Sequence, residues 1–290
     1  MKRTMKQLLT ILAAGLLAVS CIININGGTW VGACTEDGID YTEVRDVPPF
    51  SALSSSLPCN VYYVQADRQE VRVESTQEFA PKVLTGVEDG ILKLKLEEGR
   101  YPRLILRVVV SSPDIESLSV RGSGNLIHEG TLHASRDLSL RVSGSGDIQA
   151  GDIDCRGFDA HVSGSGDLRI ASLTCGEFDA HVSGSGAERI GTVTCTGIDA
   201  SVGGSGHITV DAARVDGDVQ ARISGSGRIR FEDIQAEGDM DLSTSGSGSM
   251  TLNGSCHEVN ASTSGAGSIS GNLTHTGIRT RSTGSGRVNL

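Results

Sequence analysis

A Gly-x-Gly triplet recurs through the chain from residue 122 onward, at nearly constant spacing. Successive triplets lie 22, 20, 20, 20, 21, 21, 19 and 19 residues apart. A flexible Gly/Ser linker would lack the apolar residues that stand between these triplets. A fixed period of about 20 residues is typical of a solenoid, in which each repeat buries its apolar face against its neighbours. The triplets begin at Gly122, Gly144, Gly164, Gly184, Gly204, Gly225, Gly246, Gly265 and Gly284.

The residues before each triplet alternate between apolar and polar. Phe158, Ala160 and Val162 are apolar, Asp159 and His161 between them are polar, and the following repeats keep this alternation. A period of two predicts β-strands with one buried face, and a repeat of about 20 residues is too short to hold a helix as well. At about 3.3 Å per residue, each repeat would close a coil with about three short sides. Because parallel crossovers are almost always right-handed, the sequence predicts an all-β fold, a right-handed parallel β-helix of about nine coils.

The triplets themselves are expected at the corners of the coils. Glycine there would permit backbone conformations closed to other residues, and it would let stacked chains approach closely. We therefore interpret the recurring Gly-Ser-Gly as architecture, not as a site.

The chain divides into four segments on this reading. Residues 119–290 form the β-helix repeats, and residues 46–118 form a β-rich N-terminal cap whose strands are expected to make the first, wider coils. Asp89-Gly90 is a turn signal within the cap. Residues 21–45 are interpreted as a partly ordered tether, and residues 1–20 as a signal peptide.

The N-terminus predicts export with a lipid anchor. Three basic residues precede an apolar stretch, Leu8–Val19, that is too short to span a bilayer comfortably. Small residues then lead to Cys21, as in a bacterial lipobox, so we expect Cys21 to be acylated and to hold the protein to the membrane. The alternative is an ordinary cleaved signal with a chance cysteine. The predicted location is the outer membrane of a Gram-negative envelope, on the periplasmic face or the cell surface.

The charge of the chain excludes nucleic-acid binding. Loss of residues 1–20 removes three positive charges and no negative ones, so the net charge goes from −10 to −13. Phosphate binding depends on clustered Lys and Arg, and no lysine follows Lys95.

Aligning the repeats predicts a polar ladder on the outside of the coils. Asp159, Asp179 and Asp199 should stack above one another, with His161 and His181 two positions along on the same face. Stacked carboxylates repel by up to about 1 kcal/mol per pair, which a bound cation could relieve. The alternative is a solvated polar face that salt screens. These five residues are the candidate surface contacts, and no catalytic, cofactor or metal residue is assigned.

The cysteines divide into two groups. Cys155, Cys175 and Cys195 occupy equivalent positions and are expected to form an inward column of free thiols, because in-register side chains fit a disulfide dihedral poorly. Cys34 and Cys59 could pair in an oxidising compartment, but their spacing does not decide the matter.

No hydrolase motif accounts for the many Ser-Gly pairs. No segment fits the G-x-S-x-G elbow, and no helix is expected to follow one. The stacked aspartates keep one rival open, a degenerate carbohydrate-active β-helix, although such enzymes usually build a cleft from long loops. The coils here are too uniform in length for such loops.

The last repeat carries Arg279, Arg281 and Arg287 at the open end of the solenoid. Charged edges protect a sheet against further strand pairing. The alternative is that this end docks a partner.

With a lipobox, the lead "SLSVRGSGNL" and coils of the type Val142–Ile148 ("VSGSGDI"), the chain resembles the putative auto-transporter adhesin, head GIN domain family. The resemblance implies a β-helical envelope protein with an adhesive role. An auto-transporter ends in a membrane β-barrel, whereas this sequence ends within its ninth repeat, so we expect a lipid anchor in its place. The predicted function is a non-enzymatic, adhesin-like binding or scaffold module whose partner is a glycan or a protein.

Overall fold

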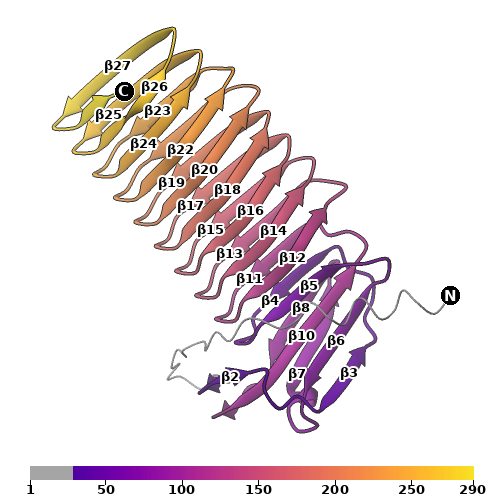
Figure 1. The fold of residues 1–290 in the computed structure, drawn as a ribbon. Helices are drawn as coiled ribbons and strands as arrows, with labels where there is room; N and C mark the ends of the chain where they lie inside the picture. Colours follow the sequence, from indigo (N-terminus) through magenta and orange to yellow (C-terminus); the bar gives the residue numbers. More distant parts are fainter. Residues whose placement is uncertain (1–28) are drawn as a thin grey trace.

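The computed structural model describes residues 29–290, which form a β-solenoid with a wider N-terminal cap (Figure 1). The solenoid has two long faces, a 14-stranded sheet and a 12-stranded sheet, and the chain alternates between them. The expected signal peptide, Cys21 and residues 21–28 of the expected tether lie outside the described residues. None of the helices described between residues 29 and 290 has the length and hydropathy to cross a membrane.

Nine strands of the solenoid belong to each sheet, which confirms the prediction of about nine coils. Every pairing between neighbouring coils is parallel. The 12-stranded sheet contains β11 (Ser117–Val120), β13 (Leu138–Val142), β15 (Phe158–Val162), β17 (Glu177–Val182), β19 (Gly197–Val202), β21 (Val219–Ile223), β23 (Met240–Thr244), β25 (Glu258–Gly265) and β27 (Gly277–Gly284). The 14-stranded sheet contains β12 (Leu126–His133), β14 (Ile148–Asp154), β16 (Leu168–Thr174), β18 (Ala187–Cys195), β20 (His207–Val215), β22 (Arg228–Ala236), β24 (Ser249–Ser255), β26 (Ser268–Thr274) and β28 (Arg287–Asn289).

The core consists of inward columns with one residue from each coil. Val162, Val182 and Val202 are direct register partners and are at most 1% exposed, so they lie in one column as the alternation predicted. The strands of the 14-stranded sheet bend near their middle. Ile170 and Leu173 are both buried although they are three residues apart, so the alternation of inward and outward side chains shifts by one residue between them. Each coil therefore has two strands but three inward-facing runs, which agrees with the expected three sides.

Close approach is what requires glycine at the corners. A Cβ on Gly166 would lie 2.0 Å from the carbonyl oxygen of Gly146 in the coil below. The Ser165 amide donates to the Gly144 carbonyl at 3.0 Å, so the corners also hydrogen-bond from coil to coil. Among the triplet glycines of the described chain, only Gly265 and Gly284 have a positive φ. Of the two expected reasons for glycine, the stacking distance is therefore the general one.

The cap extends both sheets beyond the first coil. β4 and β5 pair in parallel with β11 and β12, whereas the outer pairs β6–β10, β3–β6 and β7–β8 are antiparallel. The expectation that all cap strands form wider coils is therefore wrong. Asp89 and Gly90 both have positive φ and form a two-residue turn between β7 and β8, and such a turn joins antiparallel strands only. The cap elements are β1 (Trp30–Val31), β2 (Cys34–Thr35), β3 (Tyr41–Arg45), β4 (Ala52–Ser55), β5 (Val61–Gln65), β6 (Glu70–Ser75), the 3-10 helix η1 (Ala80–Lys82), β7 (Val83–Glu88), β8 (Ile91–Leu96), β9 (Arg100–Tyr101) and β10 (Leu104–Ser112).

The cap begins earlier than the sequence suggested. β1, β2 and β3 all fall within residues 21–45, the segment interpreted as a tether, and β3 pairs with β6 over its whole length. A disulfide between Cys34 and Cys59, with a Cα–Cα distance of 5.6 Å, fixes this segment to the cap. The boundary between tether and cap at residue 45 is thus corrected, because β3 is the edge strand of the 14-stranded sheet, β2 pairs with β10, and β1 pairs with β9 in a two-stranded sheet.

The repeated cysteines are free, as predicted. Cys155 and Cys195 are buried and Cys175 is partly buried, and none of them forms a disulfide. Burial raises the pKa of the Cys155 and Cys195 thiols to about 12, so both stay protonated at neutral pH. They act as small apolar side chains of the column.

Candidate functional site

The predicted ladder lies on the outside of the 12-stranded sheet, on β15, β17 and β19. Asp159 pairs in register with Asp179, and Asp179 with Asp199. His161 and His181 are register partners two positions further along. The alternation places these side chains outward, because the residues between them are buried. We call these five residues the Asp/His face.

Two arginines pair with the ends of the aspartate column. Arg141 of β13 forms an ion pair with Asp159, and Arg222 of β21 contacts Asp199 at 3.0 Å. Asp179 stands between them with no hydrogen bond or ion pair to any described residue. Burial, and then the neighbouring carboxylates with Asp199 foremost, raise its pKa above the ordinary value. The middle of the ladder therefore presents an unpaired acceptor.

The two histidines form a stacked pair. Their ring centroids are 4.9 Å apart and the ring planes differ by 15°. His181 Nδ1 shares a hydrogen bond of 2.7 Å with the Ser201 hydroxyl of the next coil. Burial, and then His181, lower the pKa of His161, so its ring is neutral at neutral pH. The stacked pair presents a flat surface beside the carboxylates.

This arrangement suits contact more than chemistry. Carboxylate oxygens accept hydrogen bonds from hydroxyl or amide groups, and flat rings pack against C–H surfaces. Arg141, Arg222 and Ser201 complete the face, and the sequence reasoning missed them. Arg141 and Arg222 occupy the same repeat position as His161 and His181, so carrying the alignment one coil further in each direction would have found them. Within residues 29–290, no three His, Cys, Asp or Glu side chains are grouped so that they could hold a metal ion.

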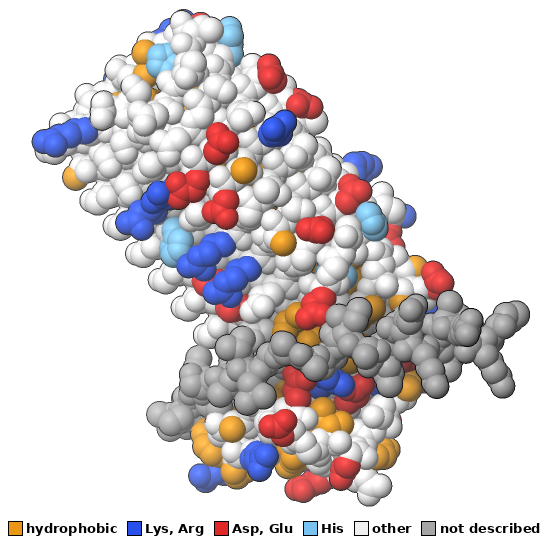
Figure 2. Space-filling view, viewed as in Figure 1, with side chains coloured by type: hydrophobic (Ala, Val, Ile, Leu, Met, Phe, Trp, Pro, Cys, Tyr) orange, Lys and Arg blue, Asp and Glu red, His pale blue; other side chains and the backbone are white. Residues whose placement is uncertain are grey.

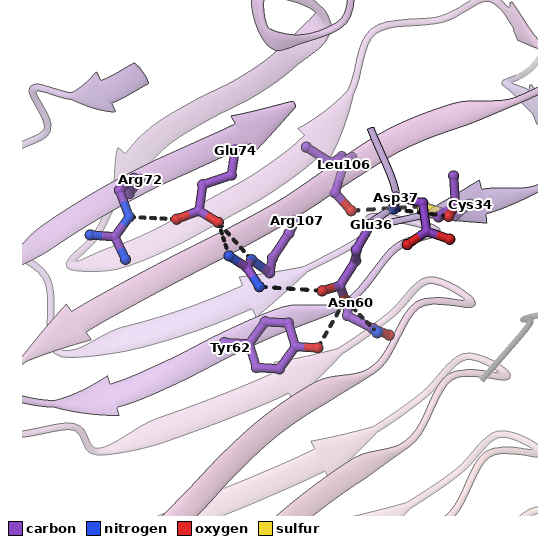
Figure 3. Close-up of polar contacts among 10 residues, drawn as sticks. Cys34, Glu36, Asp37, Asn60, Tyr62, Arg72, Glu74, Leu106 and Arg107 are labelled. Carbon is purple, nitrogen blue, oxygen red and sulfur yellow. Dashed lines mark hydrogen bonds and ion pairs between the residues drawn. The ribbon is translucent and has the colours of Figure 1, made fainter. Parts of the chain in front are cut away.

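A second polar cluster lies in the cap (Figure 3). Arg107 of β10 donates to Glu74 at 2.6 Å and to Glu36 at 3.5 Å. Glu36 also accepts from the Tyr62 hydroxyl at 2.8 Å, while Arg72 donates to Glu74 at 2.8 Å. Two cations thus balance two carboxylates, and each group is satisfied by the others. The cluster fastens the segment after β2 to the sheet, and it leaves no charge unpaired for a ligand.

One residue departs from the pattern of the core. Glu188 in β18 lies in register between Leu168 and Ile208 and is 0% exposed. Neither of its carboxyl oxygens has a hydrogen-bond partner in the described structure. Burial, and then Asp159, raise its pKa well above the ordinary value. An alignment of the repeats would have identified Glu188 as a polar residue at a core position, because the equivalent residues of the neighbouring coils are Leu168 and Ile208.

The outer surface of the solenoid carries mixed charge. On the face seen in Figure 2, acidic and basic side chains are interspersed among small uncharged ones along the coils, and hydrophobic side chains gather over the cap. On the 14-stranded sheet, Arg169 of β16 contacts Asp147 of the preceding coil at 2.7 Å and Asp167 of its own coil at 2.6 Å. This arginine therefore joins two successive coils.

One family model matches most of the chain, and several solved structures share its fold. Residues 49–233 and 214–290 match the family model described as "Putative auto-transporter adhesin, head GIN domain". A putative adhesin from Parabacteroides distasonis has 17% identity and a TM-score of 0.68, and the match covers 85% of this chain and 98% of that one. A putative adhesin from Parabacteroides merdae has 16% identity and a TM-score of 0.62, covering 88% and 98%.

A structure described as a putative lipid binding protein from Parabacteroides distasonis is also similar. It has 18% identity and a TM-score of 0.57, and the match covers 88% of this chain and 97% of that one. At these identities the structures show a shared fold alone. Among curated proteins, none matches this chain.

Proposed function

This chain belongs to the family described as putative auto-transporter adhesin, head GIN domain, and from that premise we propose that it is a non-enzymatic binding module of the cell envelope. The family match confirms the resemblance inferred from the Gly-Ser-Gly coils. The proposed partner is a glycan or a protein, bound on the outside of the solenoid.

The observation that carries this proposal is the unpaired centre of the Asp/His face. Asp179 lacks a partner, and the His161–His181 stack lies directly beside it on a rigid sheet. Outward positions of a solenoid are free to vary without disturbing the core, and stacked repeats present them as an extended surface. Binding there would satisfy the carboxylate and cover the rings.

The proposed location is the envelope, with a lipid on Cys21. The Cys34–Cys59 disulfide supports export, because disulfides persist in oxidising compartments. Cys21→Ala should move the protein from the membrane fraction to the soluble fraction. Recovery of this variant in the membrane would contradict the anchor. Protease treatment of intact cells then distinguishes the cell surface, where the protein is cleaved, from the periplasmic face, where it is protected.

Binding can be tested with an array of host and microbial glycans and matrix proteins. We expect saturable binding that Asp179→Asn and His181→Ala each weaken about tenfold. Asp211→Asn is the matched control, since it removes one exposed carboxylate from the opposite sheet. Equal losses in all three variants would show a general charge effect and contradict the proposal.

The same array tests the rival function, a degenerate carbohydrate-active enzyme using the stacked aspartates. Each glycan that binds is incubated with the protein and examined for released oligosaccharide. Product that disappears in Asp179→Asn would establish the rival. Binding without product supports the proposed module.

Lipid binding, which the description of one structural neighbour names, is not favoured by the cavity at the cap. A cleft of about 620 Å³ lies between the cap and the first corners. Its lining includes Val31 and Leu96 but also the charged Lys95, Glu98 and Arg121. An acyl chain would leave these charges desolvated and unpaired, which is costly.

A further inference from the structure

The outside of the 12-stranded sheet is hollowed beyond the Asp/His face, towards the C-terminal end. A groove of about 290 Å³ lies over β21, β23, β25 and β27. We call it the arginine groove, and its principal lining side chains are Arg222, Asp241, Ser243, Ser262, Arg279 and Arg281.

The groove exists because side-chain size changes along one outward column. Arg222, Ser243, Ser262 and Arg281 are successive register partners on β21, β23, β25 and β27. Two serines therefore lie between two arginines in one line. Strands in a sheet are about 4.8 Å apart, so the two arginines stand about 14 Å apart at the backbone. The short serines form the floor, and the long arginines form the two ends.

The lining of the groove holds more cationic than anionic side chains, although the chain carries a net charge of −10. The one carboxylate of the lining, Asp241, already accepts a hydrogen bond from Asn260 at 3.0 Å, and Arg222 contacts Asp199 at 3.0 Å outside the lining. Arg279 contacts Glu258 at 2.7 Å, whereas Arg281 has no hydrogen bond or ion pair to a described residue. The Ser243 and Ser262 hydroxyls likewise have no partner there. The groove thus offers a free guanidinium above two free hydroxyls.

We propose that the arginine groove binds an acidic glycan, with a carboxylate or sulfate on Arg281 and sugar hydroxyls on Ser243 and Ser262. Guanidinium groups bind such anions in a bidentate manner, and a hydroxyl-lined floor matches a polyhydroxylated ligand. Arginine clusters also bind acidic peptide motifs, but the free Ser243 and Ser262 hydroxyls favour the glycan, because each can form a hydrogen bond with a sugar hydroxyl. This inference rests on the proposed function and assigns its ligand class.

The charge pattern also gives the ligand a direction. The anionic group lies at Arg281, and the chain of sugars extends over the serines towards Arg222 and the Asp/His face. Asp199 and Asp179 repel anionic groups at that end, because like charges repel. At least one anionic group of the ligand therefore lies at the Arg281 end.

The test is calorimetric titration of the full chain with three defined probes. They are a heparin-derived tetrasaccharide, trigalacturonate and the neutral trisaccharide maltotriose. We expect the two acidic probes to bind and maltotriose to bind at least tenfold more weakly. Arg281→Ala should weaken the acidic probes about tenfold, and Ser262→Leu should do the same by filling the floor without a change in charge.

Arg228→Ala is the matched control, because it removes one exposed arginine from the opposite sheet. It should change affinity less than twofold. Equal binding of maltotriose, or equal losses in Arg228→Ala and Arg281→Ala, would overturn the inference. So would a poly-glutamate peptide that binds more tightly than either acidic sugar.

The two proposals can fail separately. If the groove variants bind normally but Asp179→Asn abolishes binding to the array ligand, the groove assignment fails and the proposed function stands. If neither set of variants affects binding, both fail.

Discussion

Replacing Glu188 by leucine should stabilise the solenoid. The carboxyl is fully buried, has no hydrogen-bond partner among the described residues and lies between Leu168 and Ile208. An unsatisfied buried polar group costs about 1–3 kcal/mol, and leucine at this position would add apolar contact in place of that cost. We therefore expect Glu188→Leu to raise the free energy of unfolding by about 1–3 kcal/mol at pH 5.

The gain should grow as the pH rises. The raised pKa means that folded Glu188 keeps a proton which the unfolded chain releases above the ordinary value of a glutamate. Between those two pKa values, the wild type loses about 1.4 kcal/mol of stability per pH unit through this group. The penalty is absent below the ordinary pKa, and it reaches its full size above the folded one. Leucine has no proton to release, so the variant loses this slope.

The assay is urea unfolding at pH 5, 6, 7 and 8, with thermal melts as a second measure. A gain of 1 kcal/mol corresponds to about 2–4 °C in Tm for a chain of roughly this size. The difference between wild type and variant cancels the titration of all other groups. Glu188→Gln is the control, since its side chain does not titrate but still leaves a buried polar group unsatisfied. Parallel stability curves for wild type and Glu188→Leu, or a less stable variant, would refute the reasoning.

Three further predictions concern the corners, the cap and the histidines. Gly166→Ala should lower the free energy of unfolding, measured by urea titration, by about 1–3 kcal/mol, because the new Cβ would lie 2.0 Å from the carbonyl oxygen of Gly146. Gly86→Ala is the control and should leave stability unchanged, because a Cβ there meets nothing within 4 Å. Reducing the Cys34–Cys59 disulfide should lower the free energy of unfolding by about 2–4 kcal/mol, which should appear as a lower Tm in dithiothreitol. By NMR, His161 should titrate below the ordinary histidine value, and His181→Ala should raise its midpoint. Because the pKa of His161 is lower in the folded than in the unfolded chain, the unfolded ring takes up a proton at a higher pH. Protonation of His161 should therefore lower the stability of the protein as the pH falls through the ordinary histidine range.

The repeated part of the fold was predictable because every coil solves the same packing problem. The alternation around Phe158 and Val162 fixed which residues lie inward, and the spacing of the triplets fixed the coil length. These two periods were enough to place Asp159 above Asp179 and His161 above His181. Register between identical coils needs no knowledge of distant contacts.

The cap was less predictable because its contacts join residues far apart in the sequence. Arg107 of β10 bonds to Glu74 of β6 and to Glu36 in the segment after β2, a segment interpreted from the sequence as part of a tether. Strands of similar composition can pair in parallel or antiparallel, and only the turn at Asp89-Gly90 decides between them locally. The Cys34–Cys59 pair likewise depends on where β2 lies against the sheet.

The outward side chains show a further limit of sequence reasoning. The alternation says that Arg222 and Arg281 point outward, but an arginine side chain is longer than the spacing of about 4.8 Å between coils. It can therefore pair with the coil on either side or with none. Arg222 turns back to Asp199, Arg279 turns to Glu258, and Arg281 is left free. Which cation remains available depends on competition among neighbouring carboxylates, so the binding surface follows from where the repeat is interrupted and not from the repeat itself.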